Sequence, residues 1–169
     1  MAAAAQTQPQ AEPIAIIGMA CRFPGGASTP EAYWQLLEQQ RDAISEVPAE
    51  RWSADPLPGD PPELRAARWG AFLADVDRFD AQFFEISPRE AKHMDPQQRL
   101  LLEVTWEALE RAGQAPERLK GTRTGVFTGV VLTDYEKLST AAEVAQDMYT
   151  VTGNGHCFLA GRLSYVLGL

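Results

Sequence analysis

Residues 95–113, DPQQRLLLEVTWEALERAG, carry the local signals of one helix from its first residue to its last. Asp95 can accept a hydrogen bond from the free backbone N–H groups of a first turn, and Pro96 suits the first helical position. Gln98 stands where a capping-box side chain reaches back, and Gly113 supplies the left-handed residue that commonly ends a helix. The sequence therefore predicts a long helix here, against which the rest of the chain must pack.

The apolar side chains of this segment form two neighbouring stripes at helical spacing. They are Leu101, Thr105, Ala108 and Ala112 in the first stripe and Leu102, Trp106 and Leu109 in the second. Such a wide apolar face predicts burial on more than one side of the helix. Opposite charges also stand four residues apart, at Arg99 and Glu103 and at Glu107 and Arg111. This spacing predicts exposed ion pairs worth about 0.2–0.5 kcal/mol each.

Two runs of apolar and β-branched residues predict strands that are buried on both faces. They are IAIIGM, residues 14–19, and TGVFTGVV, residues 124–131. Such runs are typical of the middle of an α/β sheet. Helical signals begin at Pro30 and at Pro88, and a last helical pattern follows the glycines of residues 152–155, which predict a turn. Strands separated by helices predict a layered α/β arrangement.

The connecting segments predict loops and short elements. Residues 47–62 are rich in Pro, Gly and Asp, which predicts a surface loop in which Trp52 is an anchoring side chain. Residues 68–73 predict a short edge strand, and residues 79–84 predict a helical turn that presents phenylalanines to the core. Residues 134–148 form a mixed polar connection with some helical character.

The composition of the 169-residue chain, 45% hydrophobic and 22% charged, is that of one globular domain. We expect residues 1–12 to be a flexible lead-in and residues 13–169 to form the domain. A net charge of −8 without a basic cluster argues against nucleic acid or an anionic membrane as partner. The sequence lacks an apolar run near the roughly 20 residues that span a bilayer, and its two cysteines suit a reducing cytosol, so we expect a cytoplasmic location.

Two motifs suggest chemistry, and each has a simpler interpretation. The strand with glycines at residues 14–26 suggests a dinucleotide-binding turn, but Ala20 and Phe23 stand where that fingerprint requires glycines. Cys157 beside His156 suggests a nucleophile with its base. Neighbours in sequence usually point apart, however, so a small core side chain is the simpler interpretation of the cysteine.

Metal and carboxylate chemistry find equally little support. The candidate ligands Cys21, His93, His156 and Cys157 lack the spacing of zinc ligands. A catalytic role for Asp95 is unnecessary, because its position as a helix cap already explains it. The residues alone therefore predict an α/β domain in which no catalytic residue, cofactor site or metal site can be named.

Four longer motifs carry a second kind of information. They are IAIIGMACRFPGG, SPREAKHMDPQQRLLLEVTWEALERAG, GVFTG and AGRLSYVLGL. Their order and spacing resemble the start of the beta-ketoacyl synthase, or ketosynthase, domain of modular type I polyketide synthases. The resemblance runs from about Pro13 to Leu169, which is nearly the whole chain.

This resemblance implies a thiolase-like fold, an α/β layered sandwich of two similar halves that dimerises, of which this chain supplies the first part only. In the family, the segment similar to AGRLSYVLGL is soon followed by the nucleophilic cysteine, and two histidines come much later. None of the three has a counterpart here. The chain is therefore expected to be truncated before the nucleophile, to contain no catalytic residue and to be inactive alone.

The family reaction transfers an acyl chain from the phosphopantetheine arm of an acyl carrier protein to that cysteine, followed by decarboxylative Claisen condensation with a malonyl-type extender. The resemblance thus implies an acyl carrier protein, an acyl thioester and a homodimer as partners, with no cofactor bound by this segment itself. It also implies that residues 130–135 approach the acyl pocket near the dimer interface, with Leu132 closest to a pocket-lining position. A plain strand end remains the alternative interpretation of Leu132.

Two other functions stay open. The chain could be a non-catalytic ketosynthase-like module for assembly or interaction, or a nucleotide-binding oxidoreductase domain. We also expect the isolated chain to be poorly soluble, because a half-sheet leaves unpaired edges and an apolar face exposed.

Overall fold

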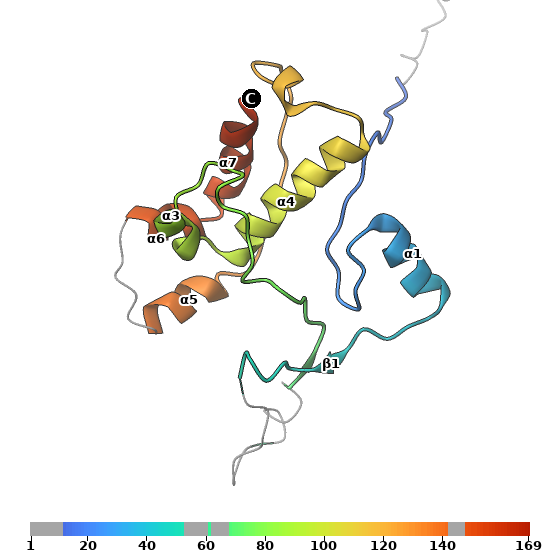
Figure 1. The fold of residues 1–169 in the computed structure, drawn as a ribbon, viewed down its shortest axis with the longest axis vertical. Helices are drawn as coiled ribbons and strands as arrows, with labels where there is room; N and C mark the ends of the chain where they lie inside the picture. Colours follow the sequence, from blue (N-terminus) through green and yellow to red (C-terminus); the bar gives the residue numbers. More distant parts are fainter. Residues whose placement is uncertain (1–11, 53–60, 62–67, 142–147) are drawn as a thin grey trace, which may run out of the picture.

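The computed structural model describes residues 12–52, 61, 68–141 and 148–169. Its helices are α1 (Pro30–Glu38), α3 (Pro88–His93), α4 (Pro96–Arg111), the 3₁₀ helix η1 (Pro116–Arg118), α5 (Asp134–Ala141), α6 (Met148–Asn154) and α7 (Cys157–Leu167). Its strands are β1 (Ser45–Glu46) and β2 (Trp69–Gly70), which pair antiparallel. Helix α4 crosses the middle of the molecule, with α3, α6 and α7 on one side and α1 on the other (Figure 1).

Helix α4 begins and ends as the sequence predicts. Asp95 is its N-cap, and the Asp95 side chain accepts a hydrogen bond of 2.8 Å from the Gln97 N–H. Pro96 is the first helical residue, and Gly113 follows the C-cap with a φ of 64°. The local signals at both ends were therefore sufficient to define this helix.

One face of α4 forms the core with α7 and with the segment before α3. The buried cluster consists of Phe84, Ile86, Met94, Leu102 and Leu163. Trp106 packs against this cluster, and its ring makes edge contacts with the rings of Phe83 and Phe84. The phenylalanines of residues 79–84 thus face α4, as predicted, although Phe83 remains half exposed.

A second face of α4 is covered by the N-terminal segment. Gly18 lies so close to α4 that a Cβ atom there would overlap the Ala108 carbonyl and the Ala112 side chain. Two ion pairs support this side: Arg22 with Glu107, and Arg111 with Glu31 of α1. The prediction that α4 is buried on more than one side is confirmed.

The side-chain pairings predicted within α4 are wrong. Gln98 does not close a capping box, because its side chain bonds residues of α6 and α7 instead. The i,i+4 ion pairs do not form in the described structure, since Arg99 is buried and both Glu107 and Arg111 bond the N-terminal part of the chain. An exposed helical pair stabilises by only a few tenths of a kcal/mol, so tertiary partners readily replace it.

Neither of the two predicted buried strands forms in the described part of the chain. Residues 14–19 and 124–131 carry no strand assignment, and Ile14 and Phe127 are each 96% exposed. A strand is held by hydrogen bonds to neighbouring strands, and the described residues offer these two segments no such neighbour. The prediction that these two segments are buried strands is therefore wrong for the described structure, because burial needs a partner surface.

The remaining elements follow the sequence closely, with two exceptions. Helices α1 and α3 begin at Pro30 and Pro88 as expected, capped by the Thr29 and Ser87 side chains, and part of the 68–73 segment forms β2. Trp52 is half exposed and only edges the Phe72 ring, so it does not anchor the loop in the core; most of residues 47–62 lies outside the described residues. Of the two glycines in residues 152–155, Gly155 lies in the turn between α6 and α7 as predicted, whereas Gly153 lies inside α6.

Gly153 and Gly161 form a matched pair of helical glycines with different surroundings. A Cβ atom on Gly153 would overlap the His93 carbonyl, whereas a Cβ atom on Gly161 would meet nothing within 4 Å. Close approach therefore explains the glycine in α6 but not the one in α7.

We expect Gly153→Ala to destabilise the chain by about 1–3 kcal/mol, because α3 and α6 must separate. Gly161→Ala is expected to stabilise it by about 0.5–1 kcal/mol, the usual gain for alanine inside a helix. Urea titration of the helical circular dichroism signal measures both. Equal shifts of the two midpoints would contradict the close α3–α6 contact.

The exposed apolar segments also predict self-association of the isolated chain. Ile16→Glu combined with Phe127→Glu is expected to reduce the aggregated fraction in light scattering, since both side chains are more than four-fifths exposed. Gln35→Glu combined with Gln82→Glu adds the same charge at exposed polar positions and controls for charge alone. An unmodified chain that stays monodisperse and monomeric in light scattering would contradict this prediction.

Candidate functional site

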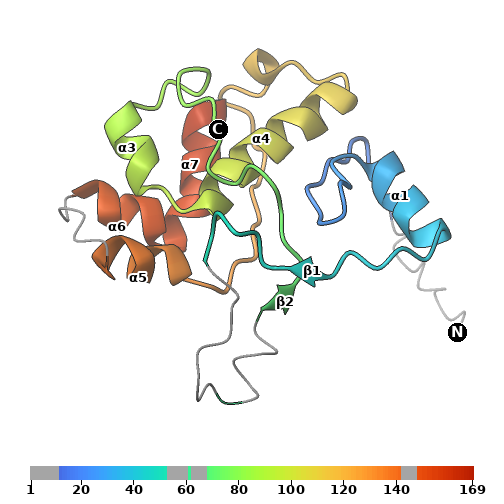
Figure 2. The same cartoon turned by 60° about the horizontal axis from the view of Figure 1, so that its bottom comes forward.

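A network of polar side chains surrounds the start of α4. Residues of α3, α6, α7 and the segment that leads into α5 all converge there, although they lie far apart in sequence (Figure 2). Most of the donors reach backbone carbonyls and not other side chains. This network includes the residues that follow the second predicted strand, and it is the candidate functional site.

Asp95 connects the start of α4 to α6. Its backbone N–H donates to the Gly153 carbonyl at 2.9 Å, while its buried side chain caps α4. The Gln97 side-chain amide also lies 3.2 Å from each Asp95 carboxylate oxygen. The capping carboxylate therefore fixes the direction of the Gln97 amide.

The Leu132 carbonyl accepts two hydrogen bonds from side chains. Gln97 Nε2 donates at 3.1 Å from α4, and His156 Nε2 lies at the same distance from the junction of α6 and α7. A carbonyl only accepts, so the His156 ring must carry a proton on Nε2. Both lone pairs of this carbonyl are thus used, while the Leu132 side chain itself is 59% exposed.

Arg99 and Tyr135 hold the next turn of the same segment. The buried Arg99 guanidinium donates to the Met94 carbonyl from Nε at 2.9 Å and from Nη2 at 2.6 Å. Nη2 also donates to the Tyr135 hydroxyl at 3.1 Å, and that hydroxyl donates to the Lys92 carbonyl at 2.7 Å. The start of α5 is therefore tied to the α3–α4 junction.

A second arginine connects α7 to α3 and α4. Arg162 donates to Glu90 Oε1 at 2.5 Å and to Gln98 Oε1 at 2.9 Å, and its side chain is 12% exposed. Gln98 in turn donates to the Thr152 carbonyl at 3.2 Å. Close to this group, Asn154 Nδ2 donates to the His93 carbonyl at 3.0 Å. These contacts fix the relative positions of α3, α4, α6 and α7.

The candidate residues from the sequence do not assemble into a reactive centre. Cys157 is exposed at the first position of α7, while the His156 ring faces the Leu132 carbonyl. Cys21 is partly buried, which raises the pKa of its thiol, and His93 Nδ1 lies 2.9 Å from the Arg89 carbonyl. The described residues contain no group of three or more side chains placed to hold a metal ion.

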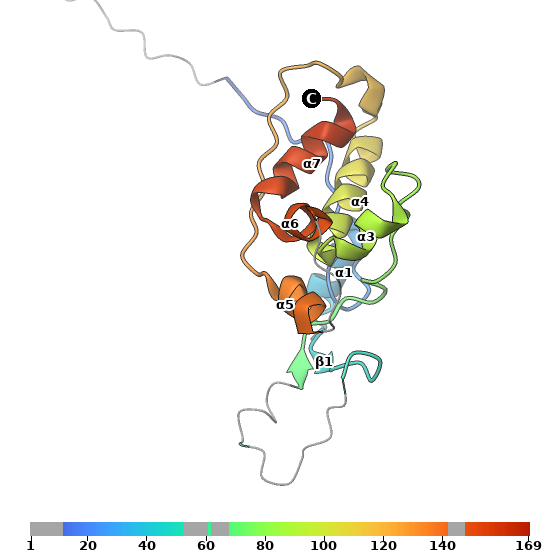
Figure 3. The same ribbon diagram turned by 90° about the vertical axis from the view of Figure 1, so that its left-hand side faces the viewer.

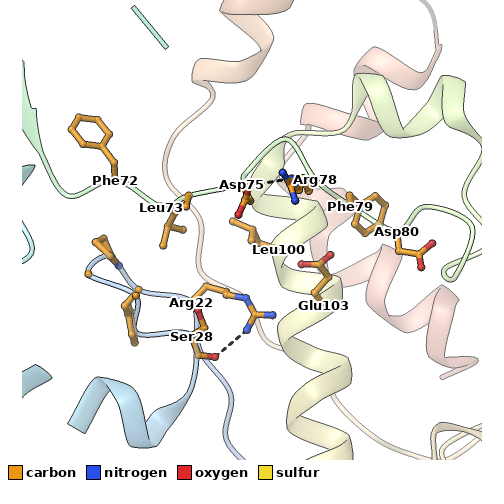
Figure 4. Close-up of a pocket in the computed structure, with 15 residues that line it drawn as sticks. Arg22, Ser28, Phe72, Leu73, Asp75, Arg78, Phe79, Asp80, Leu100 and Glu103 are labelled. Atoms are coloured by element: carbon orange, nitrogen blue, oxygen red, sulfur yellow. Dashed lines mark hydrogen bonds and ion pairs between the residues drawn. The ribbon is translucent and has the colours of Figure 1, made fainter. Parts of the chain in front are cut away.

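A separate pocket of about 410 Å³ lies between the N-terminal loop, the segment after β2 and α4 (Figure 4). Its wall carries charges of both signs, including Arg22, Asp75, Arg78, Asp80 and Glu103. Arg22 is bound to Glu107 and Asp75 to Arg78, which partly neutralises the wall. Burial raises the pKa of the Glu103 carboxyl above 4.5; Arg22 opposes this rise, and Glu107 and Asp80 add to it.

The family model for the beta-ketoacyl synthase N-terminal domain matches residues 11–169 of this chain. The chain belongs to the beta-ketoacyl synthase family. The matched residues include all four motifs that carry the resemblance. Separately, no helix in the described part of the chain is long and apolar enough to cross a membrane.

The curated relatives that match the chain include polyketide synthases. It is 53% identical over 163 residues to one phenolphthiocerol/phthiocerol polyketide synthase protein of Mycobacterium tuberculosis, covering 94% of this chain and 9% of the relative. It is 51% identical over 165 residues to a second protein of the same synthase, covering 94% of this chain and 10% of the relative. The chain thus spans about a tenth of the length of these relatives.

Solved ketosynthases share its fold. The oxazolomycin ketosynthase domain OzmH KS7 of Streptomyces albus JA3453 superimposes with a TM-score of 0.74 at 34% identity, covering 90% of this chain and 26% of that one. The ketosynthase from module 6 of the bacillaene synthase of Bacillus subtilis 168 gives a TM-score of 0.73 at 33% identity, covering 92% and 24%. This beta-ketoacyl synthase segment therefore has part of a thiolase-like fold, and the predicted fold class is confirmed.

Most of the polar network was not predicted from local patterns. Gln97, Arg99 and Tyr135 gave no periodic signal that distinguishes a buried tether from a solvated residue. Arg162 lies in the motif AGRLSYVLGL, between apolar positions of the last helical pattern. This position was the one sequence signal of a buried polar contact, because a charged residue is buried only when it is paired.

The raised pKa of Glu103 predicts a pH-dependent stability. The folded chain binds the Glu103 proton more tightly than the unfolded chain, so the ionised carboxylate disfavours folding above the raised pKa and has no effect well below 4.5. Glu103→Gln is therefore expected to raise the urea midpoint at neutral pH, and the gain should shrink as the pH falls toward 4.5. Glu117→Gln, in exposed η1, controls for the lost charge, and a gain that grows at low pH would contradict the assignment.

Proposed function

We propose that this chain supplies the N-terminal part of a polyketide synthase ketosynthase, a condensing acyltransferase of the 3-oxoacyl-[acyl-carrier-protein] synthase type. The observation that carries the proposal is the family match over residues 11–169 together with 53% identity to a mycobacterial polyketide synthase. In that reaction the acyl group leaves the phosphopantetheine sulfur for a cysteine thiolate. Loss of carbon dioxide from the malonyl-type extender then gives a carbanion, which attacks the acyl carbonyl and releases the cysteine.

Within this scheme, residues 1–12 are a lead-in and residues 13–169 the domain, which stops before the nucleophile. The chain contains no counterpart of the nucleophilic cysteine or of the two histidines, so it contributes frame and pocket wall but no catalytic group. The exposed apolar segments support this division, because they are the surfaces that a larger fold would cover. Alone, the chain is therefore inactive.

Leu132 is the residue that we propose to contact the acyl chain. Its side chain is 59% exposed and apolar, while its backbone is held from two sides, as a pocket-lining residue requires. The partners follow from the same proposal: an acyl carrier protein that carries phosphopantetheine, the acyl thioester, the malonyl-type extender and a second copy of the domain. A cytoplasmic location without nucleic-acid or membrane partners stays a prediction.

A non-catalytic assembly module is the alternative function. The comparisons and the described structure offer no observation that favours it. The relatives that match are named as synthases, and the solved structures as ketosynthases.

A hybrid synthase tests the proposal. It takes the Mycobacterium tuberculosis synthase that is 53% identical to this chain and replaces its matched region with residues 12–169. We expect the hybrid synthase to release carbon dioxide from a malonyl-loaded carrier protein and to elongate an acyl thioester, and we expect the 169-residue chain alone to do neither.

The unmodified mycobacterial synthase is the matched control, assayed with the same carrier protein. A hybrid that is folded by circular dichroism but fails to condense, beside an active control, would refute the proposed function. Condensation by the isolated chain would refute the proposal that its catalytic groups lie elsewhere.

A further inference from the structure

We propose that His156 and Gln97 are positioning residues that hold the Leu132 backbone and thereby set which acyl-chain lengths the enzyme accepts. The inference rests on the proposed function, because it assigns a role to two side chains around the same pocket residue. Neither side chain is proposed to touch the acyl chain. Each acts through the peptide group that Leu132 shares with Thr133.

The segment before α5 depends on this contact. It runs in an extended path from η1 past α7 to the start of α5 (Figure 3). Val126 packs against the core, but Phe127 and Val131 are 96% and 85% exposed. Among the described residues, the polar contacts that join residues 125–132 to other elements are the two hydrogen bonds to the Leu132 carbonyl.

The His156 side chain does not serve the helix that it precedes. His156 lies directly before α7 with an αR backbone, and its side chain makes no capping hydrogen bond. Its ring instead reaches the Leu132 carbonyl, 24 residues away in sequence. Because the ring makes no capping bond and instead contacts this distant carbonyl, the distant contact is the role that we assign to it.

Gln97 approaches the same carbonyl from a rigid base. Its amide is oriented by the Asp95 carboxylate, and Asp95 is buried and bonded to the Gly153 carbonyl. Because both lone pairs of the Leu132 carbonyl are occupied from two directions, the peptide plane after Leu132 has little freedom to rotate. Fixing that plane also fixes the backbone from which the Leu132 side chain projects.

Loss of the two donors should therefore loosen the pocket wall without removing any pocket atom. In the hybrid synthase, the measured quantity is the ratio of kcat/KM for octanoyl and acetyl N-acetylcysteamine thioesters. His156→Ala and Gln97→Met are each expected to change this ratio by about threefold, and the double variant by about tenfold, the scale of one and two lost hydrogen bonds to a carbonyl. His156→Gln keeps an N–H donor near Nε2 and should restore the ratio.

Cys157→Ala is the matched control, because it alters the neighbouring exposed side chain and leaves both donors in place. Hydrogen exchange of the peptide that spans residues 128–135 provides a readout that does not depend on turnover. We expect faster exchange there in the double variant and unchanged exchange in Cys157→Ala.

The outcomes separate the two proposals. An active hybrid whose chain-length ratio is the same in the double variant would overturn this inference alone, as would unchanged hydrogen exchange at residues 128–135. An inactive but folded hybrid would refute the proposed function and, with it, the role in substrate choice. A changed ratio restored by His156→Gln would establish His156 as a positioning residue.

Discussion

The cap that Asp95 places on α4 is the contact on which the rest of the described structure depends. The Asp95 carboxylate caps the first turn of α4, and the backbone N–H of Asp95 donates a hydrogen bond to the Gly153 carbonyl in α6. Asp95 thus caps the start of α4 and also joins α4 to α6. Met94, directly before Asp95, and Leu102 in α4 both lie in the buried hydrophobic core.

Sequence reasoning succeeded where the deciding interaction was local. Capping residues, a proline at the first helical position and a glycine after the last turn each act within about four residues, so α1, α3 and α4 could be located from the sequence. It failed where the partner was distant. Arg99 and Glu107 have suitable helical neighbours in sequence, but Arg99 bonds the Tyr135 hydroxyl and Glu107 bonds Arg22, because burial strengthens such contacts beyond an exposed pair.

The two predicted strands fail for a related reason. Their composition was recognised as that of buried strands. The family and fold implied by the resemblance of the four longer motifs were confirmed by the comparisons. Strand formation is itself a non-local event, however, since backbone groups in a strand are satisfied only by another strand. In the described structure, Ile14 and Phe127 are exposed and have no neighbouring strand. Preference for burial is encoded in the segment, but the burial itself is not.

The polar network at the start of α4 has a defined geometry, although the two predicted strands have no neighbouring strand among the described residues. Many of its side chains, among them Gln97, Arg99, Asn154 and His156, donate to carbonyl oxygens of the main chain. A hydrogen bond to a backbone carbonyl does not depend on the side chain of the accepting residue. Position 132 can therefore carry a different side chain while its backbone stays fixed. Under the proposed function, Leu132 lines the acyl pocket, and such a frame would let that wall vary with the substrate while residues elsewhere hold its backbone in place. Leu132 shows this arrangement, because its side chain is exposed while its carbonyl accepts two hydrogen bonds.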